Sequence, residues 1–108
     1  QAHGLATSRC DREEAVAIHE IFNESETPVV AAKSFTGNLG AASGLVEAMS
    51  SLLAIRENQL FGTLNYETPD PDCPIRISRE CGNPGDSVLN LSITPQGQAS
   101  AVIIRRFS

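Results

Sequence analysis

The segment from Asn38 to Glu57 constrains the fold of this 108-residue chain more than any other. Its side chains are mostly small or apolar, and Glu47 is the only charged one before the last turn. Helices that are apolar on every side are typically buried, so we expect a central helix here, capped by Asn38. Gly40, Gly44 and Ala48 recur every fourth residue, which lets another backbone approach one face. Because glycine costs about 1 kcal/mol in a helix interior, tight packing must outweigh propensity.

The remaining pattern alternates helix and strand and ends in a hairpin. A capping-box-like start and apolar residues at helical spacing predict a helix over 11–22. The apolar run 28–32 behind a proline predicts a buried strand, and residues 75–77 predict a short one. Ser87–Ile93 and Ala99–Ile104 predict a hairpin across a glycine-containing turn. This order favours an α/β fold with a mixed sheet covered by helices.

Composition excludes several classes of partner. Lys and Arg number 8 against 13 Asp and Glu, a net charge of -5, which argues against a nucleic-acid surface. The uncharged run 34–46 is too short to span a bilayer, and no leader pattern indicates secretion. Cys10, Cys73 and Cys81 lie at no zinc-like spacing. We therefore expect a cytoplasmic protein with reduced thiols, no metal site, and no membrane or nucleic-acid partner.

Four ionisable side chains stand out for their chemistry. A buried Glu47 needs a cationic partner, and Lys33, the single lysine, ends the predicted strand just before the helix. The alternative is that Glu47 is solvated on an exposed patch. His19 lies in an amphipathic helix and is expected at the surface. His3 lies in a turn of small residues, where a side chain can be held at a cleft.

Four segments stand out as motifs: Ala2–Thr7 with Asp11 and Glu14, Lys33–Glu47, Thr63–Pro71 and Ala101–Arg106. In order and spacing they are similar to AHGTxT…D..E, KSxxGHxxGAAGxxE, TLN.E.PDP and the closing strand of the β-ketoacyl-acyl carrier protein synthases. These ketosynthase II-like condensing enzymes serve fatty acid and polyketide synthesis. The resemblance covers nearly the whole chain and implies a thiolase-like fold. Residues 1–108 would form most of the C-terminal half-domain, with the N-terminal half absent.

The resemblance implies an acyltransferase that catalyses decarboxylative Claisen condensation of malonyl-carrier protein with an acyl-enzyme thioester. His3 matches the first of two histidines that donate to the enolate oxygen, and Lys33 with Glu47 matches the pair that orders the site. Thr7 matches a threonine that contacts the phosphopantetheine arm of the carrier. The implied partners are acyl carrier protein and a second ketosynthase chain, in a homodimer or heterodimer. No cofactor is expected beyond the phosphopantetheine of the carrier.

The chain departs from the family pattern at three places in the implied site. Asn38 replaces the second histidine, although its amide still donates, as in the ketosynthase III and chalcone synthase branches. Leu5 replaces a threonine expected at the pantetheine, and residues 93–97 replace a glycine-rich gating loop, which would stiffen it. These departures point to altered or lost activity. The family's cysteine nucleophile belongs to the N-terminal half, and Cys10 is a poor substitute beside Asp11, so this chain alone is expected to be inactive.

Three functions remain open from the sequence. The chain belongs to an active ketosynthase, or to a non-catalytic homologue like the chain-length factors, which pair with an active ketosynthase as structural subunits. The third possibility is a small α/β domain with no chemistry of its own. The sequence leaves the acyl-chain specificity open, and it does not separate fatty acid from polyketide synthesis.

Overall fold

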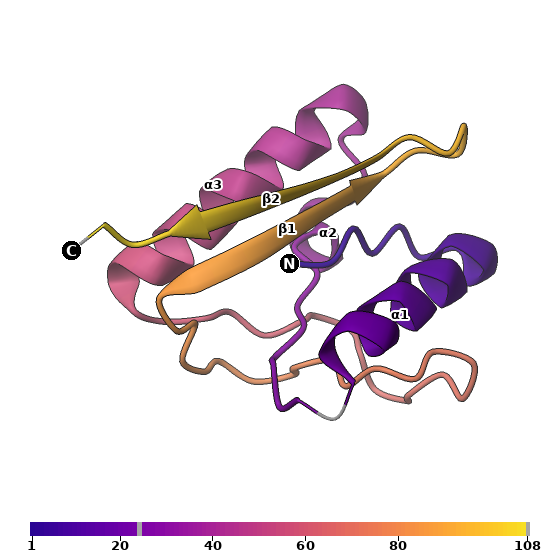
Figure 1. The fold of residues 1–108 in the computed structure, drawn as a ribbon, viewed down its shortest axis with the longest axis horizontal. Coiled ribbons are helices and arrows are strands. Elements are labelled where there is room, and N and C mark those ends of the chain that lie inside the picture. The colour runs from indigo at the N-terminus through magenta and orange to yellow at the C-terminus, as the bar shows by residue number, and fades with distance from the viewer. Residues whose placement is uncertain (24, 108) are drawn as a thin grey trace.

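A computed structural model describes residues 1–23 and 25–107 and contains two long helices and a hairpin (Figure 1). The elements in chain order are α1 (Ser8–Phe22), α2 (Lys33–Thr36), the 3₁₀ turn η1 (Gly40–Ala42), α3 (Ser43–Glu57), β1 (Ser87–Ile93) and β2 (Ala99–Arg105). The predicted hairpin is confirmed, with β1 and β2 antiparallel and Ile93 opposite Ala99. Gly97 has φ of 87° in the connecting turn, a conformation that favours glycine.

Main-chain hydrogen bonds extend the hairpin into a wider mixed layer. They run from Gln1 N to Leu89 O (2.8 Å), Leu91 N to Gln1 O (3.0 Å), Ala2 N to Val30 O (2.8 Å) and Ser78 N to Val29 O (2.8 Å). The predicted strands over 28–32 and 75–77 are reduced here to one parallel bridge between Val29 and Ile77. The parallel pairing does not continue beyond this bridge, because the N–H of Ala31 donates to the Thr63 side chain instead of to a neighbouring strand. Helix α2 then begins two residues later.

The two long helices cover opposite faces of this layer. Ile18 of α1 packs with Ala2 and Val29, and Leu91 of β1 joins the same cluster. The neighbouring residue on β1, Asn90, instead accepts a hydrogen bond from Ser51 Oγ of α3 at 2.6 Å. Successive side chains on a strand point to opposite faces. The predicted arrangement, a sheet layer covered by helices, is therefore confirmed.

Helix α1 begins three residues earlier than its sequence pattern predicted. Thr7 is extended at the N-cap, and the N–H of Asp11 already donates to the Thr7 carbonyl at 2.9 Å. Asp11 is thus not the cap but an acidic residue in the first turn, where its charge suits the helix N-terminus. His19 is exposed on the outer face, as predicted.

Helix α3 begins four residues later than predicted, with Ala42 and not Asn38 at its N-cap. Gly40 has φ of 61°, a left-handed conformation that a continuous helix cannot include, so η1 precedes α3. Asn38 does not cap α3 but accepts a hydrogen bond from the N–H of Gly40 at 3.1 Å. The close backbone approach expected at the small residues is not seen. A Cβ added at Gly44 would make an ordinary contact with the side chain of β1 residue Ser92, 3.7 Å from its Oγ, and one added at Gly40 would have no described atom within 4 Å.

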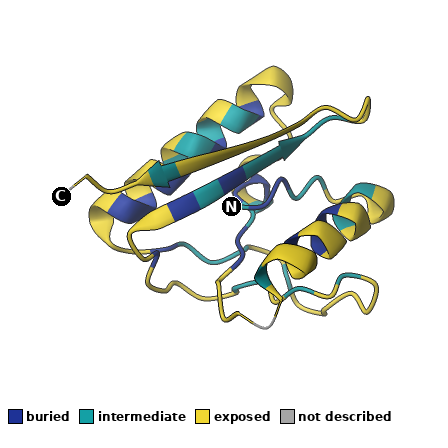
Figure 2. Ribbon diagram, in the orientation of Figure 1, coloured by how far each residue is buried: buried dark blue, intermediate teal, exposed yellow. Residues whose placement is uncertain are grey.

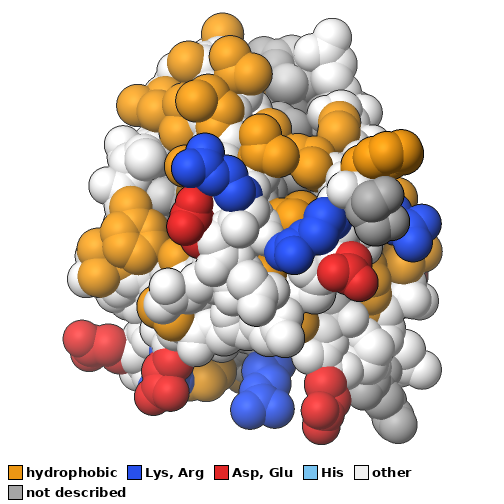
Figure 3. Space-filling model, turned by 90° about the vertical axis from the view of Figure 1, so that its left-hand side faces the viewer, with side chains coloured by type: hydrophobic (Ala, Val, Ile, Leu, Met, Phe, Trp, Pro, Cys, Tyr) orange, Lys and Arg blue, Asp and Glu red, His pale blue; other side chains and the backbone are white. Residues whose placement is uncertain are grey.

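The prediction that α3 is buried on all sides is wrong for this chain. Figure 2 shows a buried stripe along only one side of the helix. Leu45, Met49, Leu52 and Leu53 are each more than half exposed. The sheet layer covers a single face of α3, and no other described element covers the opposite one. Apolar side chains gather over the upper part of the face in Figure 3, at the height of α3.

Gly62 is expected to be the glycine least tolerant of alanine. An added Cβ would lie 2.1 Å from the carbonyl oxygen of Arg79, a main-chain atom that cannot rotate away. Gly62→Ala should therefore destabilise the protein by roughly 2–3 kcal/mol, as overpacking does. Gly82→Ala is the matched control, because no atom lies within 4 Å of its added Cβ. Urea unfolding midpoints measure the difference, and equal midpoints would contradict the expectation.

Candidate active site

The predicted pair between Lys33 and Glu47 is confirmed. Lys33, the first residue of α2, reaches Glu47 on the inner face of α3, and their side chains are 5% and 3% exposed. The alternative of a solvated Glu47 is therefore excluded. Lys33 Nζ also donates to the His3 carbonyl oxygen at 2.7 Å, so three acceptors surround the buried ammonium when the His3 ring is included.

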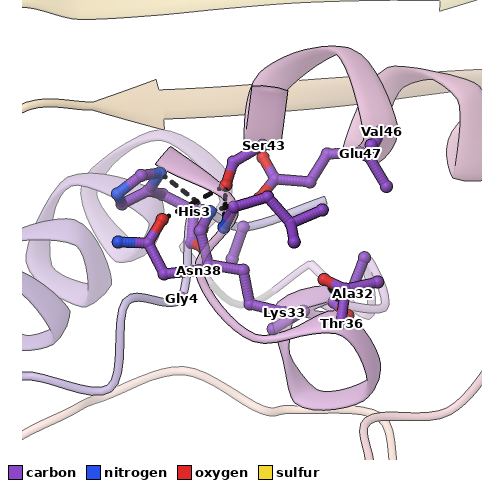
Figure 4. Close-up of polar contacts among 12 residues, drawn as sticks. His3, Gly4, Ala32, Lys33, Thr36, Asn38, Ser43, Val46 and Glu47 are labelled. Atoms are coloured by element: carbon purple, nitrogen blue, oxygen red, sulfur yellow. Dashed lines mark hydrogen bonds and ion pairs between the residues drawn. The ribbon is translucent and has the colours of Figure 1, made fainter. Parts of the chain in front are cut away.

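The contact between Lys33 and His3 determines the tautomer of the imidazole. Lys33 Nζ lies 3.2 Å from His3 Nδ1, and His3 is 8% exposed. An ammonium group only donates, so Nδ1 must accept, and the ring proton sits on Nε2. Figure 4 shows the outer ring nitrogen pointing away from Lys33. His3 therefore presents an N–H donor on that side.

Glu14 holds the main chain on both sides of the His3 side chain, a contact that sequence reasoning missed. Its two carboxylate oxygens accept from the N–H groups of His3 (2.6 Å) and Gly4 (3.0 Å). Gly4 has φ of 54°, and an added Cβ there would lie 2.8 Å from Ala31 Cβ. The available sequence signal was that Glu14 is the last residue of the motif AHGTxT…D..E, which begins beside His3. Glu14 thus anchors the turn that carries the imidazole.

Asn38 is exposed, and its side-chain oxygen accepts hydrogen bonds from the first residue of η1 and the first residue of α3. Oδ1 accepts from Gly40 N at 3.1 Å and from Ser43 Oγ at 3.2 Å. Ser43 and Glu47 lie one turn apart on α3, so the Asn38 contacts and the Lys33 contacts meet at the same end of that helix. No hydrogen bond joins His3 to Asn38 among the described residues. In Figure 4 their outer nitrogen atoms point to the same side.

A pocket of about 460 Å³ lies beside this cluster. Three of the four sequence motifs contribute to its wall: Gly4 and Leu5 from the first, Lys33 and Asn38 from the second, and 63–66 from the third. Segments far apart in sequence therefore meet at one concave site. Small-molecule sites typically combine such an apolar wall with a few polar groups.

The structure does not bring every predicted residue to this pocket. Lys33 and Asn38 line it, as does Leu5, whereas Thr7, His3 and Glu47 do not. Thr7 is exposed at the N-cap of α1, and His3 and Glu47 are buried beside Lys33. The loop after β1 is closed by hydrogen bonds from Thr94 N to Gln98 O (2.8 Å) and from Gln98 N to Thr94 Oγ1 (3.2 Å). These hydrogen bonds join residues of the loop to one another.

The three cysteines differ in how far they are buried. All three are free, and Cys10 and Cys73 are half-buried whereas Cys81 is exposed. Within residues 1–23 and 25–107, no group of three or more His, Cys, Asp or Glu side chains is arranged to hold a metal ion. None of the described helices is long and apolar enough to cross a bilayer.

Cys73 is expected to react slowly with alkylating reagents. Burial raises the pKa of its thiol above the usual 9.0, and nearby aspartates, Asp70 foremost, raise that pKa further. The thiolate is the reactive form, so below the raised pKa less of it is present than for an ordinary thiol. Iodoacetamide labelling from about pH 7 to about pH 10, followed by mass spectrometry, should show a rate still rising above the usual thiol pKa. Labelling of Cys73 as fast as the exposed Cys81 would contradict this.

Residues 1–67 match the family model described as Beta-ketoacyl synthase, C-terminal domain. The chain belongs to the β-ketoacyl synthase family. The resemblance of its motifs to these condensing enzymes is thereby confirmed, and the pocket is lined by the family's own motif segments.

Relatives of this β-ketoacyl synthase domain are found among curated proteins and solved structures. A Streptomyces cyaneus protein named as polyketide beta-ketoacyl synthase 1 is 33% identical over 107 residues, 95% of this chain and 25% of that protein. The 3-oxoacyl-[acyl-carrier-protein] synthase 2 of Staphylococcus aureus is 38% identical over 78 residues, 70% of this chain and 19% of that protein. The chain thus spans about a quarter or less of these relatives.

One solved structure reproduces the whole fold. The ishigamide ketosynthase/chain length factor superposes with a TM-score of 0.93 at 27% identity, covering 100% of this chain and 27% of that one. The thiolase-like fold predicted from the motifs is therefore confirmed. Over the described residues the chain itself forms two regular strands and the isolated bridge between Val29 and Ile77.

Proposed function

We propose that this domain supplies the decarboxylation half of a β-ketoacyl synthase active site, acting on malonyl groups carried by acyl carrier protein. The observation that carries the proposal is the contact between the buried Lys33 ammonium and His3 Nδ1. This contact makes His3 Nε2–H a donor held in place before any substrate arrives. Preorganised donors of this kind stabilise an oxyanion without reorganising during the reaction.

In the proposed step the malonyl thioester loses its carboxylate as carbon dioxide. The electron pair of the broken C–C bond moves to the α-carbon and is delocalised onto the thioester oxygen as an enolate. His3 Nε2–H and the Asn38 amide N–H donate to that oxygen. The α-carbon then attacks the acyl thioester held on a cysteine, whose thiolate leaves. Lys33 and Glu47 order the imidazole, and Thr7 contacts the pantetheine arm.

The remaining parts of the active site are proposed to come from the rest of a longer protein. Relatives are about four times the length of this chain, and the outer side of α3 exposes four large apolar side chains. Exposed apolar patches of this kind mark packing surfaces. We propose that residues 1–108 form most of a C-terminal half-domain whose α3 packs against an N-terminal half that carries the nucleophilic cysteine. On its own the chain would then be inactive.

The proposed partners follow from this role. Acyl carrier protein delivers the malonyl group, and a second ketosynthase chain completes a homodimer or heterodimer. The structural relative named as a ketosynthase/chain length factor supports a paired assembly. Apart from the carrier's own phosphopantetheine, the proposal invokes no cofactor.

A non-catalytic partner subunit is the second candidate, and Asn38 favours it. An amide donates less strongly to an oxyanion than an imidazolium does, and the family pattern has histidine at this position. In this reading His3 and the Lys33–Glu47 pair stabilise the fold, and the companion chain performs the chemistry. The residue at the nucleophile position of the complete protein separates the two: cysteine supports the enzyme, and any other residue supports the partner subunit.

The direct test is to incubate the complete natural protein with malonyl-acyl carrier protein and follow release of carbon dioxide and formation of acetyl-carrier protein by mass spectrometry. An acyl-carrier primer is then added, and the condensed 3-oxoacyl product is measured. Decarboxylation and condensation together would support the enzyme. No turnover by the protein, alone or with a companion ketosynthase, would overturn the proposed activity.

A further inference from the structure

We infer that Ser43 is a positioning residue that fixes which end of the Asn38 amide faces the substrate. The inference rests on the proposed function, because it concerns the donor that Asn38 offers to the enolate oxygen. Ser43 touches no substrate in this scheme and acts only through Asn38. It is 5% exposed and is the first residue of α3.

The orientation of the Asn38 amide follows from obligate donors around it. A main-chain N–H only donates, so the Asn38 atom lying 3.1 Å from Gly40 N must be the oxygen. Leu39 N donates to Ser43 Oγ at 2.8 Å. The Ser43 hydroxyl has accepted that bond, and its own proton is directed to Asn38 Oδ1 at 3.2 Å. Two donors therefore hold the oxygen of the amide.

The consequence is a single free polar end on Asn38. With Oδ1 engaged twice, only the NH₂ group is left to face outward, and Figure 4 shows it pointing away from Ser43. An exposed asparagine held by one contact rotates readily, and a rotated amide would present its oxygen to the enolate. An oxygen facing an oxyanion repels it. The Ser43 hydroxyl is thus the second contact that keeps Asn38 in the orientation that stabilises the developing charge.

Ser43 is not explained by helix capping. Ser43 is the first residue of α3, whereas the N-cap position is occupied by Ala42, which makes no side-chain hydrogen bond. The Ser43 hydroxyl is used instead by Leu39 and Asn38. The available sequence signal was that serine stands where the motif KSxxGHxxGAAGxxE has alanine, in the same segment in which asparagine replaces histidine.

The test is Ser43→Ala in the complete protein, assayed for malonyl-carrier decarboxylation. Loss of one hydrogen bond to the donor group should lower kcat by roughly tenfold. KM should change by less than about twofold, since Ser43 is buried and acts only through Asn38 in this scheme. Ser50→Ala is the matched control in the same helix: its hydroxyl donates to the Val46 carbonyl at 2.9 Å, and kcat should not change.

A second variant separates positioning from general stability. In an Asn38→Ala background, Ser43→Ala should lower kcat by less than about twofold, because the group it positions is gone. An equal loss in both backgrounds, or no loss in the wild type, would overturn the inference. If the wild type shows no decarboxylation, the proposed function fails and a crystal structure of the complete Ser43→Ala protein decides. Displacement or multiple rotamers of Asn38 would support the inference, and a single unchanged rotamer would overturn it.

Discussion

His3→Ala is expected to lower the rate of malonyl-carrier decarboxylation by about 10²–10³-fold, the usual cost of one oxyanion donor. The variant should keep its fold, because the contacts of His3 with Glu14 and one of those with Lys33 are made by main-chain atoms. Lys33 retains the His3 carbonyl and Glu47 as partners after the ring is removed. The loss should therefore fall on kcat, and it is measured as acetyl-carrier protein formed per unit time.

His19→Ala is the matched control, since the chain has two histidines and His19 is exposed on α1. Its decarboxylation rate should equal that of the wild type. Circular dichroism and melting of both variants show whether the fold is retained. Equal rates for His3→Ala and the wild type would remove His3 from the mechanism.

Glu47→Ala is expected to destabilise the complete protein by about 3–5 kcal/mol, as does removal of one partner of a buried ion pair. The Lys33 ammonium is 5% exposed and would be left with only the neutral acceptors of His3. Burying an unpaired charge costs far more than losing the attraction of an exposed pair. Urea unfolding at neutral pH, followed by circular dichroism, measures the change in midpoint.

Glu57→Ala is the control in the same helix. Glu57 Oε1 lies 3.1 Å from Arg56 Nε, and the side chains of Glu57 and Arg56 are 61% and 73% exposed. Exposed pairs contribute about 1 kcal/mol at most, so the midpoint should hardly move. The double variant Lys33→Met/Glu47→Leu should recover much of the lost stability, because it removes both buried charges. Equal destabilisation by Glu47→Ala and Glu57→Ala would contradict a buried pair.

Local sequence determined the elements whose signals are short-range. The hairpin, the apolar spacing of α1 and the turn at Gly97 each depend on neighbouring residues, and all three were predicted closely. The Lys33–Glu47 pair was also predictable, because a carboxylate in an apolar segment needs a cation and the chain has one lysine. The order and spacing of the four motifs also indicated the family from the sequence alone.

Only the tertiary structure decided which faces are covered and which atoms meet. The apolar pattern of α3 does not state whether a covering layer is present, so the burial predicted on all sides was wrong for this chain. The reduction of 28–32 to a single bridge depends on the side chain of Thr63, more than thirty residues away. The ring tautomer of His3 and the amide orientation of Asn38 depend on donors from Lys33 and Ser43. Such contacts join segments that are distant in sequence. They depend on the directions of individual hydrogen bonds, which produce no periodic pattern in the sequence.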